Sequence, residues 1–171
     1  MHACINLNAG ETPGFFTDAW FLRDCIKHHT PLQDEVGSYL TGQRMGHFYL
    51  LSRICAVEAQ VQSPVRFIGT SRSSASRLIE ILDNGNKLHA TFHSHPGGGP
   101  SATTPSCIDR RYMSSLQKRG AKVLGLICTR DGYIRAYSPL MPFLFIVQGN
   151  GVEPVEGEDH VIKIALADPR H

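Results

Sequence analysis

The spacing of apolar residues along the chain predicts three helices. The first follows an N-cap at Thr17 and closes at residues 28–31, because apolar side chains recur between these points at helical spacing. The second occupies residues 74–85, where a serine can start a helix and an Asn-Gly pair can end it. The third begins after an N-cap at Ser106 and is ended by Gly120.

Stretches of β-branched and aromatic residues predict the strands. Residues 35–42 and 48–57 are expected to pair as a hairpin, and Asp131-Gly132 is typical of a two-residue type I′ turn between two later strands. Further strands are expected at residues 66–69, 88–92, 123–128, 133–137, 144–147 and 161–167. Because helices and strands interleave, we expect an α/β fold with one mixed sheet flanked by helices.

The composition is that of an ordinary globular chain. It has 171 residues, of which 42% are hydrophobic and 19% charged, enough for one core without cross-links. We therefore expect a single domain over residues 1–171, with a core at about 15–138 that carries the motifs and a C-terminal appendage at 139–171. The net charge of +2 provides no extended positive field, so neither nucleic acid nor a membrane surface is an expected partner.

The cysteines and histidines limit which kinds of metal or disulfide site the chain can form. The five cysteines form no C-x-x-C pair, and the chain shows neither a bilayer-spanning stretch nor a secretory pattern, so we expect a cytoplasmic protein without a disulfide framework or a cysteine zinc site. Five of the nine histidines are expected to be terminal or solvated, namely His2, His28, His29, His160 and His171. The remaining candidates are His47, His89, His93 and His95.

The sharpest chemical signal is the sequence His93-Ser94-His95. Residues i and i+2 at a strand end project from the same face and can offer two imidazole nitrogens to one metal ion. Asp109, in the first turn of the third predicted helix, can add a carboxylate if the Gly/Pro-rich segment 96–105 folds back. Two histidines and a carboxylate with one open position are typical of catalytic zinc. Taken alone, an H-x-H pair is equally consistent with polar surface.

Two further residues are candidates for catalysis. Ser106-x-x-Asp109 matches the helix-capping pattern, and a hydroxyl at a helix N-terminus can both cap the helix and donate to a developing oxyanion. A hydrolytic site also needs a base that does not ligate the metal. Glu35 is the best candidate because it begins a predicted strand rich in small residues; the alternative is a solvated carboxylate at a strand end.

Together these residues resemble the JAMM motif of the JAB/MPN/Mov34 metalloproteases. The matching segments are Glu35-x-Gly37-x-x-Leu40-x-Gly42, His93-Ser94-His95-Pro96 and Pro105-Ser106-Cys107-Ile108-Asp109. Ten residues separate His95 from Ser106, where the family usually has seven, and Ser38 stands where many members have glycine. The lengthened segment is similar to that of prokaryotic members encoded beside bacterial ubiquitin-like conjugation or anti-phage genes.

The resemblance implies a zinc-dependent, deubiquitinase-like isopeptidase or peptidase with the MPN/JAB (cytidine-deaminase-like) fold. Its substrate would be the bond after the C-terminal glycine region of a ubiquitin-like protein or its conjugate. It implies one Zn²⁺ per chain held by His93, His95 and Asp109, with Glu35 as general acid and base and Ser106 as oxyanion donor.

Three questions stay open at this point. Residues 97–99 form either a mobile flap over the substrate tail or a flexible surface loop without contact to it. Arg110 and Arg111 are expected to be solvated rather than to orient acidic substrate groups. Alternative functions are a processing peptidase for a small sulfur-carrier protein and a non-catalytic MPN scaffold; a nucleic-acid deaminase is disfavoured because its H-x-E and P-C-x-x-C patterns are absent.

Overall fold

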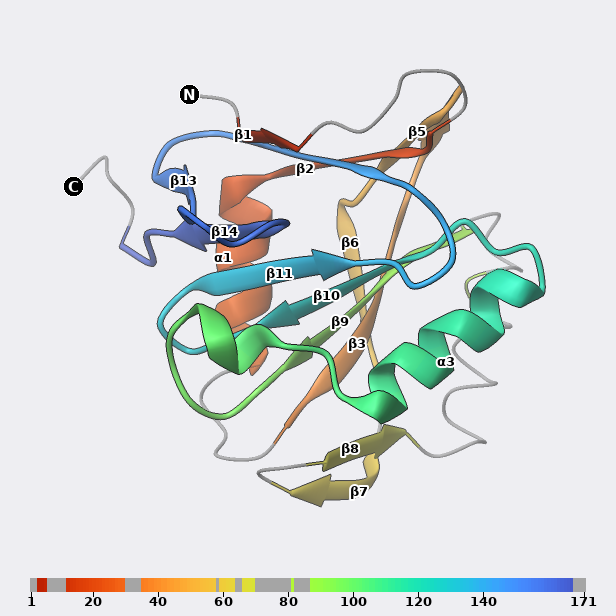
Figure 1. Cartoon of the computed structure of the whole chain (residues 1–171), viewed down its shortest axis with the longest axis horizontal. Helices are drawn as coiled ribbons and strands as arrows, with labels where there is room; N and C mark the ends of the chain where they lie inside the picture. The colour runs from red at the N-terminus through yellow and green to blue at the C-terminus, as the bar shows by residue number, and fades with distance from the viewer. Residues whose placement is uncertain are drawn as a thin grey trace.

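Two large β-sheets form the frame of the molecule, as Figure 1 shows. They belong to a computed structural model that describes residues 3–5, 12–29, 35–57, 59–63, 66–69, 81 and 87–167. The five-stranded sheet has the order β1 (Ala3–Ile5), β12 (Leu144–Gln148), β2 (Gly14–Asp18), β5 (Phe48–Leu50) and β4 (Arg44–Met45). The seven-stranded sheet has the order β13 (Val152–Pro154), β14 (Val161–Ile164), β11 (Tyr133–Tyr137), β10 (Leu124–Cys128), β9 (Lys87–Ser94), β3 (Gly37–Gly42) and β6 (Arg53–Ala56). A separate hairpin pairs β7 (Ala59–Ser63) with β8 (Arg66–Gly69).

Two helices cover opposite faces of the seven-stranded sheet (Figure 1). Leu22 of α1 (Ala19–His29) is buried in one apolar cluster with Phe92 and Leu126 of the sheet. Met113 of α3 (Cys107–Lys118) is buried in a second cluster with Ile127. Because neighbouring residues of a strand face opposite sides, the first cluster belongs to the α1 face and the second to the α3 face. The α/β class is as predicted.

The prediction of one mixed sheet is wrong, because the chain passes between two sheets within the segment 48–57. The amide of Leu51 donates to Phe16 O in the five-stranded sheet, whereas the next amide, of Ser52, donates to Thr41 O in the seven-stranded sheet. The predicted pairing of 35–42 with 48–57 therefore survives only as β3 against β6, with the β4 and β5 hairpin inserted between them.

Thr17 does not cap the first helix. It lies in β2, which pairs in parallel with β12 and β5 and runs directly into α1. Its hydroxyl donates to Leu51 O at 3.0 Å, which anchors the strand rather than the helix. The helix itself, Ala19–His29, agrees with the prediction.

The turn between β10 and β11 is also different from the prediction. Gly132 N donates to Thr129 O and Thr129 N donates to Tyr133 O, so the loop contains residues 130–132 and the turn starts at Thr129. Gly132 has a φ of 90°, whereas Asp131 is not among the residues with positive φ. This combination is a type I turn closed by a left-handed glycine, a three-residue hairpin loop rather than type I′.

His29 is buried, not solvated as predicted. Only 2% of its surface is exposed, and its ring packs edge-on against Phe92. Its Nδ1 lies 2.7 Å from Cys25 O and must donate to it, because a carbonyl only accepts. Its Nε2 therefore accepts from the Ser38 hydroxyl at 2.9 Å. The histidine thus links α1 to β3, and Ser38, where a second glycine is common, has a structural partner.

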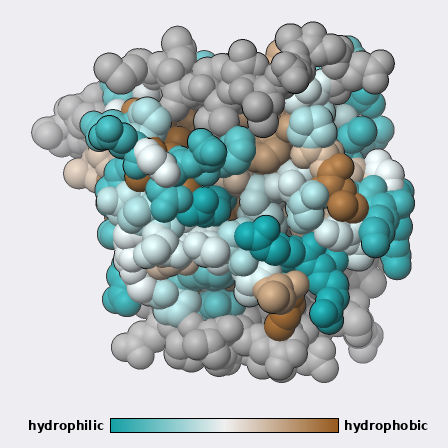
Figure 2. All heavy atoms as spheres, viewed as in Figure 1, coloured by the Kyte–Doolittle hydropathy of each residue, from teal (hydrophilic) through white to brown (hydrophobic). Residues whose placement is uncertain are grey.

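Most of the other predicted elements are present in the structure. The strands at 66–69, 88–92, 123–128, 133–137 and 144–147 and the helix after Ser106 are confirmed, and the last strand ends at Ile164 rather than 167. The predicted helix at 74–85 lies outside the described residues, apart from residue 81. No helix within the described ranges is long and apolar enough to span a membrane. The face shown in Figure 2 is mostly hydrophilic, with apolar residues in small separate patches.

Candidate metal centre and catalytic residues

Two imidazoles lie close together at the C-terminal end of strand β9. His93 pairs with Gly37 of β3 on one side and Ile127 of β10 on the other. His95 follows the strand, and its amide extends the pairing by donating to Cys128 O at 2.8 Å. The Nε2 atoms of His93 and His95 lie 3.2 Å apart, so the two rings converge as the i, i+2 spacing predicts.

Helix α3 brings in a carboxylate. Its N-terminus carries a complete capping box, in which Ser106 N donates to Asp109 Oδ2 at 2.8 Å and Asp109 N donates to Ser106 Oγ at 3.2 Å. The box fixes the Asp109 side chain in the first turn. Its Oδ1 lies 3.5 Å from His93 Nε2, and its Oδ2 lies 3.7 Å from His95 Nε2.

These three side chains fit a zinc ion. Their ligand atoms all lie within 4.8 Å of one another, and their closest separations are 3.2, 3.5 and 3.7 Å. A tetrahedral zinc ion with bonds of about 2.0–2.1 Å to nitrogen and oxygen holds its ligands roughly 3.3 Å apart. The group therefore has the donor set and the spacing for such an ion, with one coordination position left over.

The segment 96–105 fixes the orientation of the His95 ring through the nitrogen that faces away from His93, Nδ1. This segment, predicted as a plain loop, contains a 3₁₀ helix, η1 (Pro100–Thr103), and the carbonyl oxygen of Ala102 lies 2.8 Å from His95 Nδ1. Because a carbonyl only accepts, Nδ1 carries the proton and the lone pair of Nε2 faces His93 and Asp109. A backbone partner of this kind is typical of histidines that ligate metals.

The charges around the site hold Asp109 ionised. Burial alone would raise the pKa of its carboxyl, but contacts with His93, His95 and Ser106 outweigh that effect and hold the pKa well below its usual range. Burial would likewise lower the pKa of His95, but Asp109, the Ala102 carbonyl and Glu35 raise it. The group is thus a set of mutually attracting acid and base side chains.

Glu35 reaches the same point from the neighbouring strand. It is 9% exposed, and its Oε1 lies 3.9 Å from His95 Nε2. It precedes β3, and the next residue pairs with Ser94: Ser94 N donates to Val36 O at 2.9 Å, and Val36 N donates to Ser94 Oγ at 3.0 Å. Ser94, on the face opposite the two histidine rings, therefore holds the Glu35 segment at the end of β9.

Hydrogen bonds hold the lengthened segment at Gly99 and at Thr103. Gly99 N donates to Asp131 Oδ2 at 2.9 Å, and the Thr129 hydroxyl donates to the other oxygen of that carboxylate at 2.6 Å. Further along, Arg135 Nε donates to Thr103 Oγ1 at 3.2 Å. These contacts fix the segment at Gly99, whereas both hypotheses for residues 97–99 expect a flexible segment.

The sequence indicates the candidate residues but not the residues that support them. Ser94 is signalled by strand alternation, which turns it away from the histidines toward the β3 side. Ala102 acts through its backbone and leaves no side-chain signal. Of the other candidate histidines, His47 is exposed in the turn after β4, and His89 is buried with its Nε2 3.1 Å from Gly42 O, outside this group.

Comparison with known proteins adds a likeness of fold. No protein-family model and no curated protein matches the sequence. The solution structure of protein DSY2949 from Desulfitobacterium hafniense is similar with a TM-score of 0.56 at 18% identity, over 85% of this chain and 98% of that one. The crystal structure of AF2198, a JAB1/MPN domain protein from Archaeoglobus fulgidus, aligns with a TM-score of 0.46 at 14% identity, over 78% of this chain and 94% of that one.

Proposed function

We propose that this chain is a zinc-dependent isopeptidase or peptidase of the JAB/MPN/Mov34 type. One observation carries the proposal. His93, His95 and Asp109 form a group spaced for zinc, and a second carboxylate outside this group, that of Glu35, lies 3.9 Å from His95 Nε2. Three ligands, an open position and a nearby carboxylate that is not needed as a ligand are the parts of a hydrolytic metal site.

The chain's own residues divide the reaction between them. When bound, zinc would supply Lewis-acid chemistry, lowering the pKa of water and polarising a carbonyl. Glu35 takes the proton of the water that attacks the scissile carbonyl and then gives it to the leaving amine. The Ser106 oxygen already accepts from Asp109 N, so its hydroxyl proton is left to donate to the oxyanion of the substrate.

The proposed substrate is the C-terminal glycine region of a ubiquitin-like protein or of its conjugate, in a bacterial conjugation or anti-phage pathway of the cytoplasm. The three-part motif supports this class of substrate. The sheet supports the mode of binding: among the described strands, β6 is the last of the seven-stranded sheet and lies next to β3, which follows Glu35. An extended tail can add to such an edge through main-chain hydrogen bonds.

The test measures metal and cleavage separately. Protein purified without chelator is analysed for metal by mass spectrometry, together with Asp109→Ala and Glu35→Gln. We expect about one zinc per chain, lost in Asp109→Ala and kept in Glu35→Gln, because Asp109 is a ligand and Glu35 is not. Fusions that carry ubiquitin-like tails should be cleaved by the wild type alone. A chain that binds no metal even after zinc is resupplied contradicts the proposal and favours a scaffold.

A further inference from the structure

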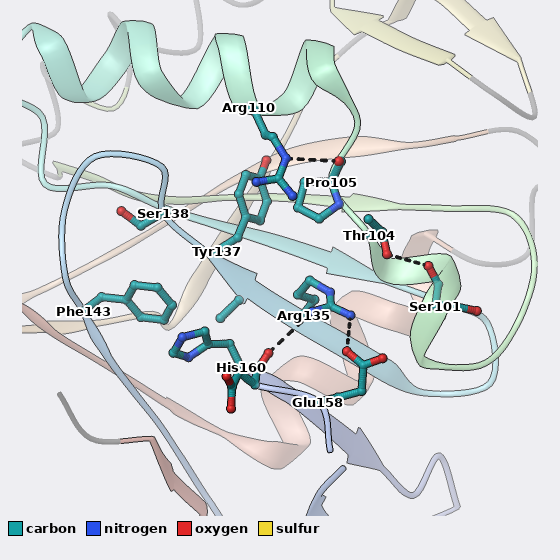
Figure 3. Close-up of a pocket in the computed structure, with 12 residues that line it drawn as sticks. Ser101, Thr104, Pro105, Arg110, Arg135, Tyr137, Ser138, Phe143, Glu158 and His160 are labelled. Carbon is teal, nitrogen blue, oxygen red and sulfur yellow. Dashed lines mark hydrogen bonds and ion pairs between the residues drawn. The ribbon is translucent and has the colours of Figure 1, made fainter. Parts of the chain in front are cut away.

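A cavity of about 420 Å³ lies beside the candidate centre and is not used in the proposed reaction. It lies between η1, the start of α3, β11 and the residues before β14 (Figure 3). Two of its lining residues flank the site in sequence: Pro105 precedes Ser106, and Arg110 follows Asp109. A chain extending from the scissile bond past the N-terminus of α3 would therefore meet this cavity.

The α3 side of the cavity is rich in hydrogen-bond donors. Arg110 donates from Nε to Pro105 O at 3.4 Å, and its other N–H groups have no partner among the described residues. Ser138 Oγ accepts from Gln117 Nε2 at 2.9 Å and from Met141 N at 3.2 Å, so its own proton is the group left to donate. Tyr137 is the third donor, because it lines the cavity and its phenol hydroxyl carries a proton. Burial, followed by the nearby Asp109 charge, raises the pKa of this hydroxyl further.

The opposite side of the cavity is already neutralised. Arg135 is held by Glu158 at 2.8 Å and by Thr103, so its charge is compensated within the protein. Figure 3 shows Arg135 and Glu158 together, across the cavity from Arg110. Asp159 also lines the cavity but is an exposed residue. The guanidinium of Arg110 is thus the cation left to attract an anion from outside.

His160, on the same wall, has an unusual backbone conformation and a ring nitrogen left unpaired by the described residues. It is the only non-glycine residue with a positive φ, 64°, in the described part of the chain. Its ring packs against Phe143 with the centroids 4.8 Å apart, and its Nδ1 is buried without a hydrogen-bond partner among the described residues. Backbone strain and an unpaired buried polar atom tend to occur at binding sites rather than in the frame of a fold.

We propose that this cavity binds a carboxylate of the substrate chain beside the scissile bond, held by Arg110, Tyr137 and Ser138. The inference rests on the proposed hydrolytic function for its place in the reaction. A carboxylate matches the donors that Arg110, Tyr137 and Ser138 contribute to the lining, and a planar guanidinium can bind both of its oxygens. The carboxylate can belong to an acidic side chain or to a chain terminus.

Binding is measured without hydrolysis, on zinc-loaded Glu35→Gln protein. Four peptides of the form acetyl-Gly-Gly-Xaa-Gly are titrated, with Xaa as Glu or Gln and the C-terminus free or amidated. The readouts are the affinity and the Arg Nε–Hε signals in NMR spectra. We expect the peptides with a carboxylate to bind about five- to tenfold more tightly than the amidated Gln peptide and to shift the Arg110 signal. Preference for amidated Glu identifies a side chain as the source, and preference for the free-terminus Gln peptide identifies a terminus.

Variants locate the effect. Arg110→Gln, at an exposed position, should remove the preference, and Tyr137→Phe should reduce it while keeping the ring that packs on Gly125. Arg111→Gln, the neighbour that does not line the cavity, should keep it. Equal binding of all four peptides, or a preference that survives Arg110→Gln, would overturn the proposal. Because no cleavage is needed, the preference can be measured even if the chain proves not to hydrolyse ubiquitin-like tails.

Discussion

The Nδ1 atom of His95 lies 2.8 Å from the carbonyl oxygen of Ala102, so a candidate metal ligand and the 3₁₀ turn η1 form one unit. Asp131 holds η1 in place, because its Oδ2 accepts a hydrogen bond from Gly99 N at 2.9 Å. Metal affinity should therefore depend on a residue that does not touch the metal. The lengthened segment between His95 and Ser106 supplies both the carbonyl and the attachment point.

Asp131→Ala should weaken zinc binding about tenfold, the lower end of the loss usual when the hydrogen-bond partners of ligands are disturbed. The change frees Gly99 and Thr129 and lets the Ala102 carbonyl move away from His95. The measurement is competition for zinc against a chromogenic chelator. Asp131→Asn keeps an acceptor oxygen and should recover much of the affinity, and Asp24→Ala controls for the lost charge. Unchanged affinity in Asp131→Ala would mean that η1 holds His95 without this anchor.

Ser94→Ala should lower the turnover number about tenfold while leaving zinc content and KM near those of the wild type. The Ser94 hydroxyl oxygen accepts from Val36 N at 3.0 Å, and without it the segment that carries Glu35 has one fewer anchor to the end of β9. A misplaced base loses proton transfer but not metal. Steady-state kinetics and metal analysis check this, with Ser115→Ala on the exposed side of α3 as control. A wild-type turnover number in Ser94→Ala rules out this positioning role.

Ser106 can be tested by separating its two roles. Ser106→Ala removes both the hydroxyl and the helix cap, which costs about 1 kcal/mol of stability, whereas glycine at an N-cap costs only a few tenths. Both variants should lose on the order of a hundredfold to a thousandfold in turnover, the usual effect of one lost oxyanion donor. Activity assays and urea unfolding measure the two effects. If Ser106→Gly is nearly as active as the wild type, so that turnover falls only where stability falls, Ser106 acts as a helix cap and not as an oxyanion donor.

Two parts of the candidate site can be predicted from the sequence because their geometry is local, whereas the approach of Asp109 to the histidines depends on how the segment 96–105 folds back. The i, i+2 spacing of His93 and His95 and the capping pattern of Ser106 and Asp109 each act within one element, so they need no knowledge of the fold. That Glu35 lies near them depends on the pairing of β3 with β9. The sequence indicates Glu35 only as the start of a predicted strand rich in small residues, and the resemblance to a known motif then gives it a role.

What the sequence does not show depends on contacts between distant residues. The passage from one sheet to the other is made by two successive amides, of Leu51 and Ser52, that bond to Phe16 and Thr41. Neither pairing has a local signature in the residues 48–57, which are rich in β formers on both sides of the passage. The burial of His29 also depends on distant residues. Helical spacing places His29 at the end of α1, but its side chain is buried by contacts with Ser38 of β3 and Phe92 of β9.

The buried His29 should make folding stability depend on pH. Burial, opposed by its bond to Cys25 O, lowers the pKa of His29 from 6.5 to about 4. The unfolded chain therefore binds a proton at higher pH than the folded chain, and stability falls as the pH drops from 6.5 toward 4. The shift corresponds to about 3 kcal/mol once the pH is below 4. His89, whose pKa burial also lowers, adds a loss of the same sign.

The contribution of His29 is isolated by urea unfolding at pH 7 and pH 4.5 in the presence of chelator, so that release of zinc does not contribute. His29→Gln should be less stable at pH 7, because it loses the link between Cys25 and Ser38, yet it should lose less stability than the wild type on acidification. His28→Gln, at the exposed neighbouring position, should keep the wild-type pH dependence. If His29→Gln and the wild type lose the same free energy between the two pH values, the buried imidazole is not the group that titrates.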